Sequence, residues 1–281
     1  MVKRAAVLGS PIAHSLSPVL HTAAYAELGL AGEWEYQRHE CAEPGLAAFL
    51  DGCDASWAGL SLTMPLKRAA LSLADTVHEP AAAVGGANTI VFRGGRRHAH
   101  NTDVAGIVAA LREAGIGRVR TATVIGAGAT AASALAALRE LGATEPHAVT
   151  ALARYLGRTA ELSAAAERMS AVVDFAPLSG IERHLDVDLV VSTVPAGAAD
   201  PLAATVAAGG AAVFDVVYAP WPTPLAAAAE DAGRTVVGGF EMLLHQAAVQ
   251  VELMTGVPRA PVEAMRAAGA AELRRRATAS A

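Results

Sequence analysis

The sequence predicts an α/β protein of two domains with mostly parallel sheets, and two observations support this. Short apolar segments alternate with alanine-rich helical patterns along the chain, as in proteins built from βαβ units. A chain of 281 residues is long enough for two ordinary domains, and its 53% of hydrophobic residues indicates a folded core. We expect an N-terminal α/β domain over 1–103, a second α/β domain over 104–237, and C-terminal helices over 238–281 that pack back on the first domain.

The N-terminal domain is predicted to begin with a strand over 5–9 and a helix from about 18 to 28. Ser17 is the predicted N-cap of that helix, with Pro18 at the first helical position. The remaining predicted strands are 34–39, 59–62, 89–92, and the short stretch from the glycine turn Gly94-Gly95 to about Asn101.

The second domain is predicted to begin with a helix over 104–114, which stops at Gly115 because glycine commonly follows a helix end. From about residue 238 the pattern is helical, and the arginine run 274–276 is predicted to be a solvated helix end. Between them lie a βαβ unit and two further strands: strand 121–125, turn 126–130, helix 131–141, and strands 148–153, 189–192 and 212–217.

Charge and composition exclude several classes of partner. The formal net charge is −5, whereas proteins that bind nucleic acid or anionic membranes present basic surfaces. The sequence contains no apolar run of about 18 residues, so we expect no membrane span. Cys41 and Cys53 lack the spacing of metal ligands, so we expect two reduced thiols, a cytoplasmic protein and no metal.

The chain has only two lysines, Lys3 and Lys67, and two asparagines, Asn88 and Asn101. Almost all of the other basic residues are arginines, so a lysine inside the chain is more readily explained by a chemical role than by composition. Lys67 lies where a predicted strand gives way to a proline turn, and both asparagines precede a threonine near a strand end. These three residues are therefore candidates for a functional site.

The segment Gly126-Ala127-Gly128-Ala129 lies between a predicted strand and a predicted helix. Glycines there let the backbone approach a pyrophosphate, and the helix N-terminus favours its negative charge. This context predicts a Rossmann-type dinucleotide site. The next strand ends at Arg154 instead of an acidic residue, and a guanidinium suits a ribose 2′-phosphate. We therefore favour NADP(H) over NAD(H).

The N-terminal domain carries groups that suit a small carboxylated molecule. Ser15 and Ser17 stand at the start of a predicted helix, where hydroxyls and free N–H groups favour a carboxylate. Lys67, Asn88 and Asp103 lie near strand ends, the part of an open α/β sheet where ligands bind. The sequence thus predicts an enzyme that moves a hydride between a nicotinamide and a small carboxylated alcohol or ketone, with Lys67 and Asp103 at the chemistry.

These segments resemble the shikimate dehydrogenase family over nearly the whole chain, and the motifs occur in the family's order. The matching motifs are Gly9-Ser10-Pro11-Ile12-Ala13-His14-Ser15-Leu16-Ser17-Pro18, Thr63-Met64-Pro65-Leu66-Lys67, Ala87-Asn88-Thr89, Asn101-Thr102-Asp103, the glycine turn at 126–129, Asp215–Tyr218 with its following prolines, and 239–248.

The resemblance implies a role for each matching residue. Lys67 and Asp103 would be catalytic. The implied substrate-binding residues are Ser15 and Ser17 for the carboxylate, and Thr63, Asn88, Tyr218 and Gln246 around the ring. The implied cofactor-binding residues are Gly126, Gly128, Ala129, Arg154, Gly239 and Met242.

The chain departs from the family pattern at three places. Ser61 stands where the family usually has asparagine, which removes one substrate hydrogen bond or leaves it to water. Ala153-Arg154-Tyr155 replaces the usual Asn-Arg-Thr and keeps only the arginine, and Ala129 replaces a typical glycine. With the last two changes NADP(H) is still the favoured cofactor, but the strength of its binding is not determined by the sequence.

The resemblance implies reversible NADPH-dependent reduction of 3-dehydroshikimate to shikimate, a step toward the aromatic amino acids. Lys67 can donate a proton to the developing alkoxide, and which of Lys67 and Asp103 is the acid–base proper stays open. The alternatives are an NAD(H)-preferring quinate/shikimate dehydrogenase, an aminoshikimate dehydrogenase and, less well matched, a methylene-tetrahydrofolate dehydrogenase or a non-catalytic dinucleotide sensor. We expect a monomer or homodimer.

Overall fold

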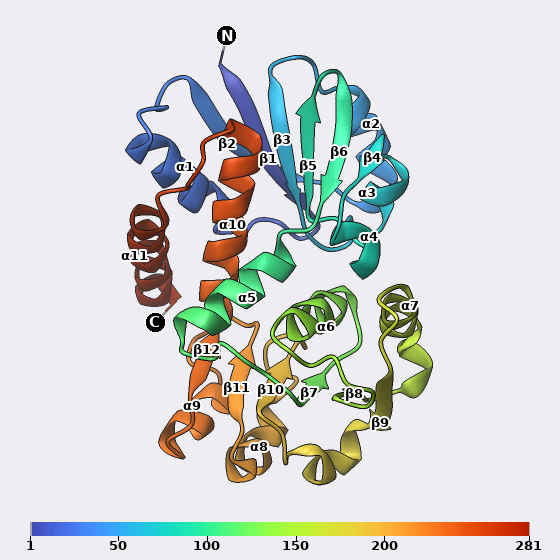
Figure 1. The fold of residues 1–281 in the computed structure, drawn as a ribbon. Helices are drawn as coiled ribbons and strands as arrows, with labels where there is room; N and C mark the ends of the chain where they lie inside the picture. The colour runs from blue at the N-terminus through green and yellow to red at the C-terminus, as the bar shows by residue number, and fades with distance from the viewer. Residues whose placement is uncertain (1, 281) are drawn as a thin grey trace. The chain divides into compact units, whose positions relative to one another are not determined.

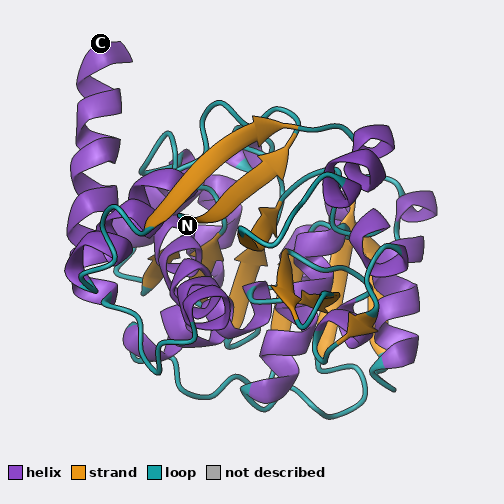
Figure 2. Ribbon diagram, turned by 90° about the horizontal axis from the view of Figure 1, so that it is seen from above, coloured by secondary structure: helices purple, strands orange, loops and turns teal. Residues whose placement is uncertain are grey.

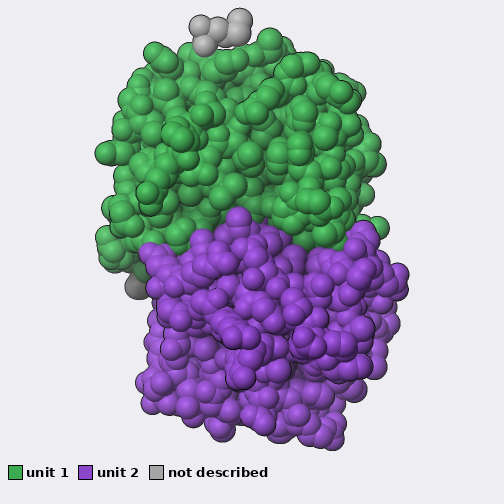
Figure 3. Space-filling view, viewed as in Figure 1, with its two compact units in different colours: residues 1–102, 244–281 green, residues 103–243 purple. Residues whose placement is uncertain are grey.

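The computed structural model describes residues 2–280 and divides into two compact units. The first unit contains residues 1–102 and 244–281, and the second contains 103–243 (Figure 3). Each unit has its own sheet with helices packed around it (Figures 1 and 2), which confirms the predicted α/β class. The sequence predicted a second domain over 104–237, and the roles assigned to the domains stay predictions.

The first unit is built on a six-stranded sheet in the order β2-β1-β3-β5-β6-β4. All its strands run in the same direction except β5, which is antiparallel to both neighbours. This exception follows from the predicted hairpin, since Gly94 and Gly95 take φ of 60° and 73° between β5 and β6. The strands are β1 (Lys3–Gly9), β2 (Trp34–Glu40), β3 (Trp57–Leu62), β4 (Thr76–Val77), β5 (Thr89–Arg93) and β6 (Arg96–His100).

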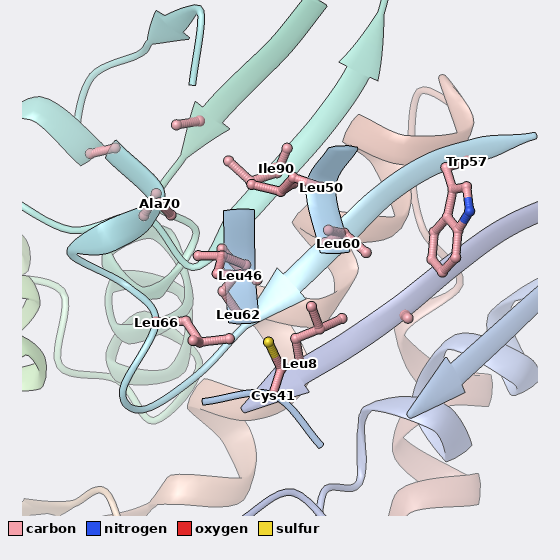
Figure 4. Close-up of a cluster of buried hydrophobic side chains, with 14 residues drawn as sticks. Leu8, Cys41, Leu46, Leu50, Trp57, Leu60, Leu62, Leu66, Ala70 and Ile90 are labelled. Carbon is pink, nitrogen blue, oxygen red and sulfur yellow. The ribbon is translucent and has the colours of Figure 1, made fainter. Parts of the chain in front are cut away.

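Both faces of this sheet are buried because β1 alternates its apolar side chains between them. Ala6 and Leu8 pack with residues of α2, α3 and α4 in the cluster of Figure 4. Ala5 and Val7 pack on the opposite face against residues of α1 and α10. The helices of this unit are α1 (Ser17–Glu27), α2 (Leu46–Asp51), α3 (Ala69–Ser72), α4 (Ala81–Val84), α10 (Gly239–Thr255), which begins in the second unit, and α11 (Val262–Ser280).

The second unit has an all-parallel sheet in the order β12-β11-β10-β7-β8-β9. When β7 to β12 are numbered 1 to 6 and the sheet is followed from β9, the order is 3-2-1-4-5-6, as in the Rossmann fold. The switch point lies between β7 and β10. The elements are α5 (Asp103–Glu113), β7 (Ala122–Ile125), α6 (Ala129–Glu140), β8 (Val149–Ala153), α7 (Ala160–Arg168), β9 (Val173–Pro177), β10 (Leu189–Ser192), α8 (Ala203–Gly209), β11 (Ala212–Asp215), α9 (Pro224–Asp231) and β12 (Val236–Gly238).

Some local predictions were wrong. Ser17 is the first residue of α1, not its N-cap, because the Ser15 hydroxyl accepts the Ser17 N–H at 3.2 Å and lets the helix begin one residue earlier. The helix after the glycine turn starts at Ala129 instead of 131. Prediction also missed the strands β4, β9 and β12 and the helices α2, α3, α4, α7, α8 and α9. Among the described residues, no helix is long and apolar enough to cross a membrane.

Candidate active site

The turn after β3 holds Thr63 and Lys67 by backbone hydrogen bonds. Thr63 N–H donates to the Leu8 carbonyl at 3.0 Å, which ties the turn to the end of β1. Only glycine fits at position 9, because a Cβ there would collide with the Thr63 methyl group. The Lys67 carbonyl accepts the Ala87 N–H at 2.8 Å. Lys67, which is half-buried, is therefore fixed next to the segment that leads into Asn88.

Asn88, Thr102 and Gln246 form a buried cluster at the ends of β5, β6 and within α10. The Asn88 amide nitrogen donates to the Thr102 hydroxyl at 2.9 Å and to the Gln246 side-chain oxygen at 3.2 Å. The Asn88 side-chain oxygen accepts the Thr102 N–H at 2.8 Å, and the Thr102 hydroxyl lies 3.2 Å from the Gln246 oxygen. The first unit thus brings together Asn88 and Gln246, two residues implied by the resemblance, through Thr102, which had no predicted role.

A second set of buried polar groups extends this cluster toward α1. The Tyr36 hydroxyl donates to Ser61 Oγ at 2.6 Å, and Ser61 donates to Gln250 Oε1 at 2.7 Å. The Gln250 amide then donates to the Thr89 hydroxyl at 2.9 Å, and Thr89 donates to the Asn88 side-chain oxygen at 2.9 Å. We call Tyr36, Ser61, Gln250 and Thr89 the buried relay. The family's asparagine is thus replaced by a serine whose hydrogen bonds are made within the protein.

Burial sets the ionisation of the groups around the relay. Burial raises the pKa of Tyr36 above its usual range, an effect opposed by its interactions with Ser61 and Ser17. The ring of His21 stacks on Tyr36 with centroids 3.9 Å apart, and burial lowers the pKa of His21 to about 3. His21 Nε2 lies 3.4 Å from Gln250 Oε1. Tyr36 and His21 are therefore uncharged at neutral pH, and His21 can donate a hydrogen bond to Gln250 without carrying charge.

The loop that carries Ser15 is held by two arginines. Arg38 donates to the Ser15 carbonyl at 3.0 Å, and Arg276 donates to the His14 carbonyl at 2.6 Å. The sequence predicted that 274–276 is a solvated helix end, and for Arg276 this was wrong because its guanidinium also pairs with Glu272 at 2.7 Å. The charge of Arg38 next to Ser15 favours an anion there, whereas the charge of Arg276 is balanced by Glu272. Neither arginine was predicted from the sequence, since no local pattern links β2 or α11 to the loop at the start of the chain.

The glycine turn of the second unit has two different glycines. Gly126 takes a φ of +116°, and a Cβ there would collide with the Thr193 hydroxyl after β10, so the strand–turn geometry itself requires glycine. Gly128 has an ordinary φ of −93°, and nothing lies within 4 Å of where its Cβ would be. The N-terminus of α6 has no side-chain cap. Bare backbone facing open space at this helix end is what a pyrophosphate requires.

Arg154 follows β8 directly and is exposed. Among the residues that the structure describes, no carboxylate forms an ion pair with it. Arg158, four residues on, lies over the Tyr155 ring at 5.9 Å. A permanently charged group at the carboxyl end of the second Rossmann strand matches the position from which dinucleotide-binding proteins read the ribose.

The loop after β11 is fixed by a buried acid. Thr223 donates to Asp215 Oδ2 at 2.7 Å while capping α9, and Val217 N–H donates to Asp215 Oδ1 at 3.2 Å. Burial raises the pKa of Asp215. Gly239 lies so close to the Val216 carbonyl that no Cβ would fit, and its N–H donates to the Val217 carbonyl at 3.1 Å. Packing of this loop therefore explains the glycine at 239 without a ligand.

The remaining residues from the sequence prediction are placed by their own elements. Asp103 is buried as the first residue of α5, directly after Thr102 in the chain. Tyr218 lies half-buried in the loop after β11, and Met242 is buried in the first turn of α10. Their roles stay predictions.

Comparison with known proteins gives one consistent family. A model described as the shikimate dehydrogenase substrate binding domain matches residues 7–90, and one described as the shikimate 5'-dehydrogenase C-terminal domain matches 239–268. The shikimate dehydrogenase (NADP(+)) of Halobacterium salinarum is 39% identical over 276 residues, which covers 95% of this chain and 98% of the relative.

Solved structures agree. The crystal structure of Mycobacterium tuberculosis shikimate dehydrogenase is 44% identical, covers 96% of this chain and 99% of its own, and superposes with a TM-score of 0.87. The shikimate 5-dehydrogenase of Thermus thermophilus, in complex with NADP(H) and shikimate, is 33% identical, covers 95% and 98%, and has a TM-score of 0.82.

Proposed function

This chain belongs to the shikimate dehydrogenase family, and we propose that it catalyses the reversible reduction of 3-dehydroshikimate to shikimate with NADPH, a step toward the aromatic amino acids. The observation that carries the proposal is the buried cluster of Asn88, Thr102 and Gln246. Side-chain amides and hydroxyls both donate and accept hydrogen bonds, so this cluster suits a ring with several hydroxyl groups.

Substrate binding at this cluster requires an exchange of partners. Asn88 already donates to Thr102 and to Gln246, and the contact with Gln246 is the longer of the two at 3.2 Å. We assign to a substrate hydroxyl the position of the Gln246 oxygen as acceptor of the Asn88 amide. Thr63 and Tyr218 are assigned as further contacts of the ring. Ser15 and Ser17 are assigned to the carboxylate, supported by the two arginines that hold their loop.

The residues of the second unit fit the cofactor. Gly126 and Gly128 with Ala129 would hold its phosphates at the open start of α6, and Arg154 would meet the ribose 2′-phosphate. Gly239 and Met242 are assigned to the border of the nicotinamide. When bound, NADPH supplies the hydride that the ring carbonyl carbon accepts.

Lys67 and Asp103 are the proposed acid–base pair. As the carbonyl carbon is reduced, negative charge develops on its oxygen, and the Lys67 ammonium can stabilise that charge and donate the proton. Asp103 is assigned to orient Lys67 and the reacting hydroxyl. In the oxidising direction the same pair takes the proton back.

The test is an absorbance assay at the reduced nicotinamide band with the purified enzyme. Four combinations are compared: shikimate or quinate with NADP⁺ or NAD⁺. The proposal requires that shikimate with NADP⁺ give the highest kcat/KM. A higher value for quinate with NAD⁺ would contradict it and favour the quinate/shikimate dehydrogenase alternative. Aminoshikimate as a third substrate tests the aminoshikimate dehydrogenase alternative.

Two further parts of the proposal concern the setting of the enzyme. We place it in the cytoplasm, which the free thiols Cys41 and Cys53 support because reduced cysteines persist there. We assign it a monomeric or homodimeric state, which sedimentation velocity over a range of concentrations would test.

A further inference from the structure

Three of the nine histidines in the chain lie together at one edge of the first sheet. His98 and His100 are two residues apart on β6, so both face the same side of the sheet. His78 directly follows β4, the edge strand that lies beside β6 in Figure 1 and pairs with it in parallel. The His78 N–H donates to the Ala99 carbonyl at 2.9 Å. The register Val77↔Ala99 places His78 beside His100.

Two ring nitrogens in this group have the separation of metal ligands. His78 Nε2 and His98 Nδ1 are 3.3 Å apart and within hydrogen-bonding distance of each other, so a metal ion would take the place of the proton that the two nitrogens share. Imidazole nitrogens bind Zn²⁺ at about 2.0–2.1 Å, and two such bonds at a tetrahedral angle place the nitrogens about 3.4 Å apart. We propose that His78 and His98 bind a divalent transition-metal ion of the Zn²⁺, Ni²⁺ and Cu²⁺ class through these two nitrogens.

His100 supports this geometry without being a ligand. Its ring stacks on that of His78 with centroids 4.3 Å apart and planes 7° from parallel, which restrains the rotation of the His78 ring. Burial, with the nearby charges of His78, His98 and Arg93, lowers the pKa of His100 to about 4.

The surroundings leave the pair available. His78 and His98 are half-buried, so water can complete the coordination. Among the described residues, no carboxylate lies within ion-pair distance of either ring. Of the neighbouring arginines, Arg97 forms an ion pair with Asp51 at 2.7 Å, and Arg93 donates to the Leu253 carbonyl at 3.3 Å and keeps its charge. Imidazole ligands favour these metals over Mg²⁺ and Ca²⁺, which prefer oxygen.

The test is calorimetric titration of the full-length enzyme with Zn²⁺ at pH 7.5. His78→Gln and His98→Gln should each weaken one saturable site by at least about 10-fold, the lower end of what removing a supporting residue costs a metal site. The matched control is His147→Gln, since His147 is exposed in the second unit and pairs with Asp174 at 2.8 Å. That variant should titrate like the wild type, and excess Mg²⁺ should not compete.

A second measurement covers variants that fold poorly. In the wild-type enzyme, substoichiometric Ni²⁺ should broaden the ring proton signals of His78 and His98 before those of His147. The proposal is overturned if the wild type has no saturable Zn²⁺ site, if well-folded His78→Gln and His98→Gln keep the wild-type affinity, or if His147 broadens first. None of these outcomes depends on the dehydrogenase activity.

Discussion

Ser61 donates to Gln250 Oε1 at 2.7 Å while it accepts the Tyr36 hydroxyl at 2.6 Å, so one small side chain joins β2 and β3 to α10. Ser61 and Gln250 are both almost fully buried. A buried polar group that loses its partner retains the full cost of its desolvation. The pair therefore determines whether the buried relay behind Asn88 is complete.

Ser61→Ala should reduce the free energy of unfolding by about 1–3 kcal/mol, because it removes the acceptor of the Tyr36 hydroxyl at 2.6 Å and leaves Gln250 Oε1 with only the longer contact to His21 at 3.4 Å. Urea unfolding followed by circular dichroism measures this. The control is Ser72→Ala, since Ser72 is exposed and donates only to a carbonyl within its own turn. Equal losses in the two variants would show that the relay adds no stability.

Lys67→Ala should lower kcat by about 100- to 10,000-fold, the usual contribution of acid–base assistance, with cofactor affinity intact. The chain offers a matched control in its other lysine, Lys3, which is exposed and donates to the Ala55 carbonyl. Steady-state kinetics with shikimate and NADP⁺, together with fluorescence titration of NADPH, separates chemistry from binding. Near-wild-type turnover in Lys67→Ala would remove Lys67 from the mechanism.

Arg154→Ser should raise the KM for NADP⁺ and leave the KM for NAD⁺ nearly unchanged, because only NADP⁺ carries the 2′-phosphate. Loss of one exposed charge contact is worth about 0.2–1 kcal/mol, so the change should be about 1.4- to fivefold. Arg158→Ser is the control, since Arg158 lies over Tyr155. If both cofactors are affected equally, Arg154 does not read the phosphate.

Arg276→Gln should raise the KM for shikimate by about 1.4- to fivefold, because it releases the His14 carbonyl and with it the Ser15 loop, without changing the KM for NADP⁺. Arg276 holds the His14 carbonyl, whereas the guanidinium of its neighbour Arg275 binds only Glu272 among the described residues. Arg275→Gln is thus a control of equal charge on the same helix. A shift of similar size in both variants would point to a general charge effect instead of positioning of the Ser15 loop.

The sequence predicted the fold well where the signal was local. The glycine hairpin at 94–95 and the strand–glycine–helix unit at 122–140 follow from residues within a few positions of each other. The contacts that complete the candidate site are not local: Gln250 is 189 residues from Ser61, and Arg276 is 262 from His14. No periodicity encodes such pairs. The exchange of asparagine for Ser61 was visible in the sequence, but its partners Tyr36 and Gln250 were not.

Acid should destabilise the enzyme through His21, a buried histidine packed against Tyr25 and Tyr36. Burial lowers the pKa of His21 in the folded protein to about 3, whereas the unfolded chain has the ordinary value of 6.5. Between these two values the unfolded state binds the extra proton, so stability is complete above pH 6.5 and falls as the pH decreases toward 3. The greatest slope from one such group is about 1.4 kcal/mol per pH unit.

His21→Leu should flatten the pH dependence of the unfolding free energy between pH 6.5 and 4, even if the variant is less stable at pH 7.5 through loss of the stacking on Tyr36. His100, whose pKa is also lowered by burial, to about 4, contributes a second slope in the same range, so the curve should flatten without becoming level. His147→Gln serves as the control for loss of an exposed histidine. Urea unfolding at four pH values measures the slope for the wild type and for both variants. An unchanged slope in His21→Leu would mean that His21 does not titrate with folding.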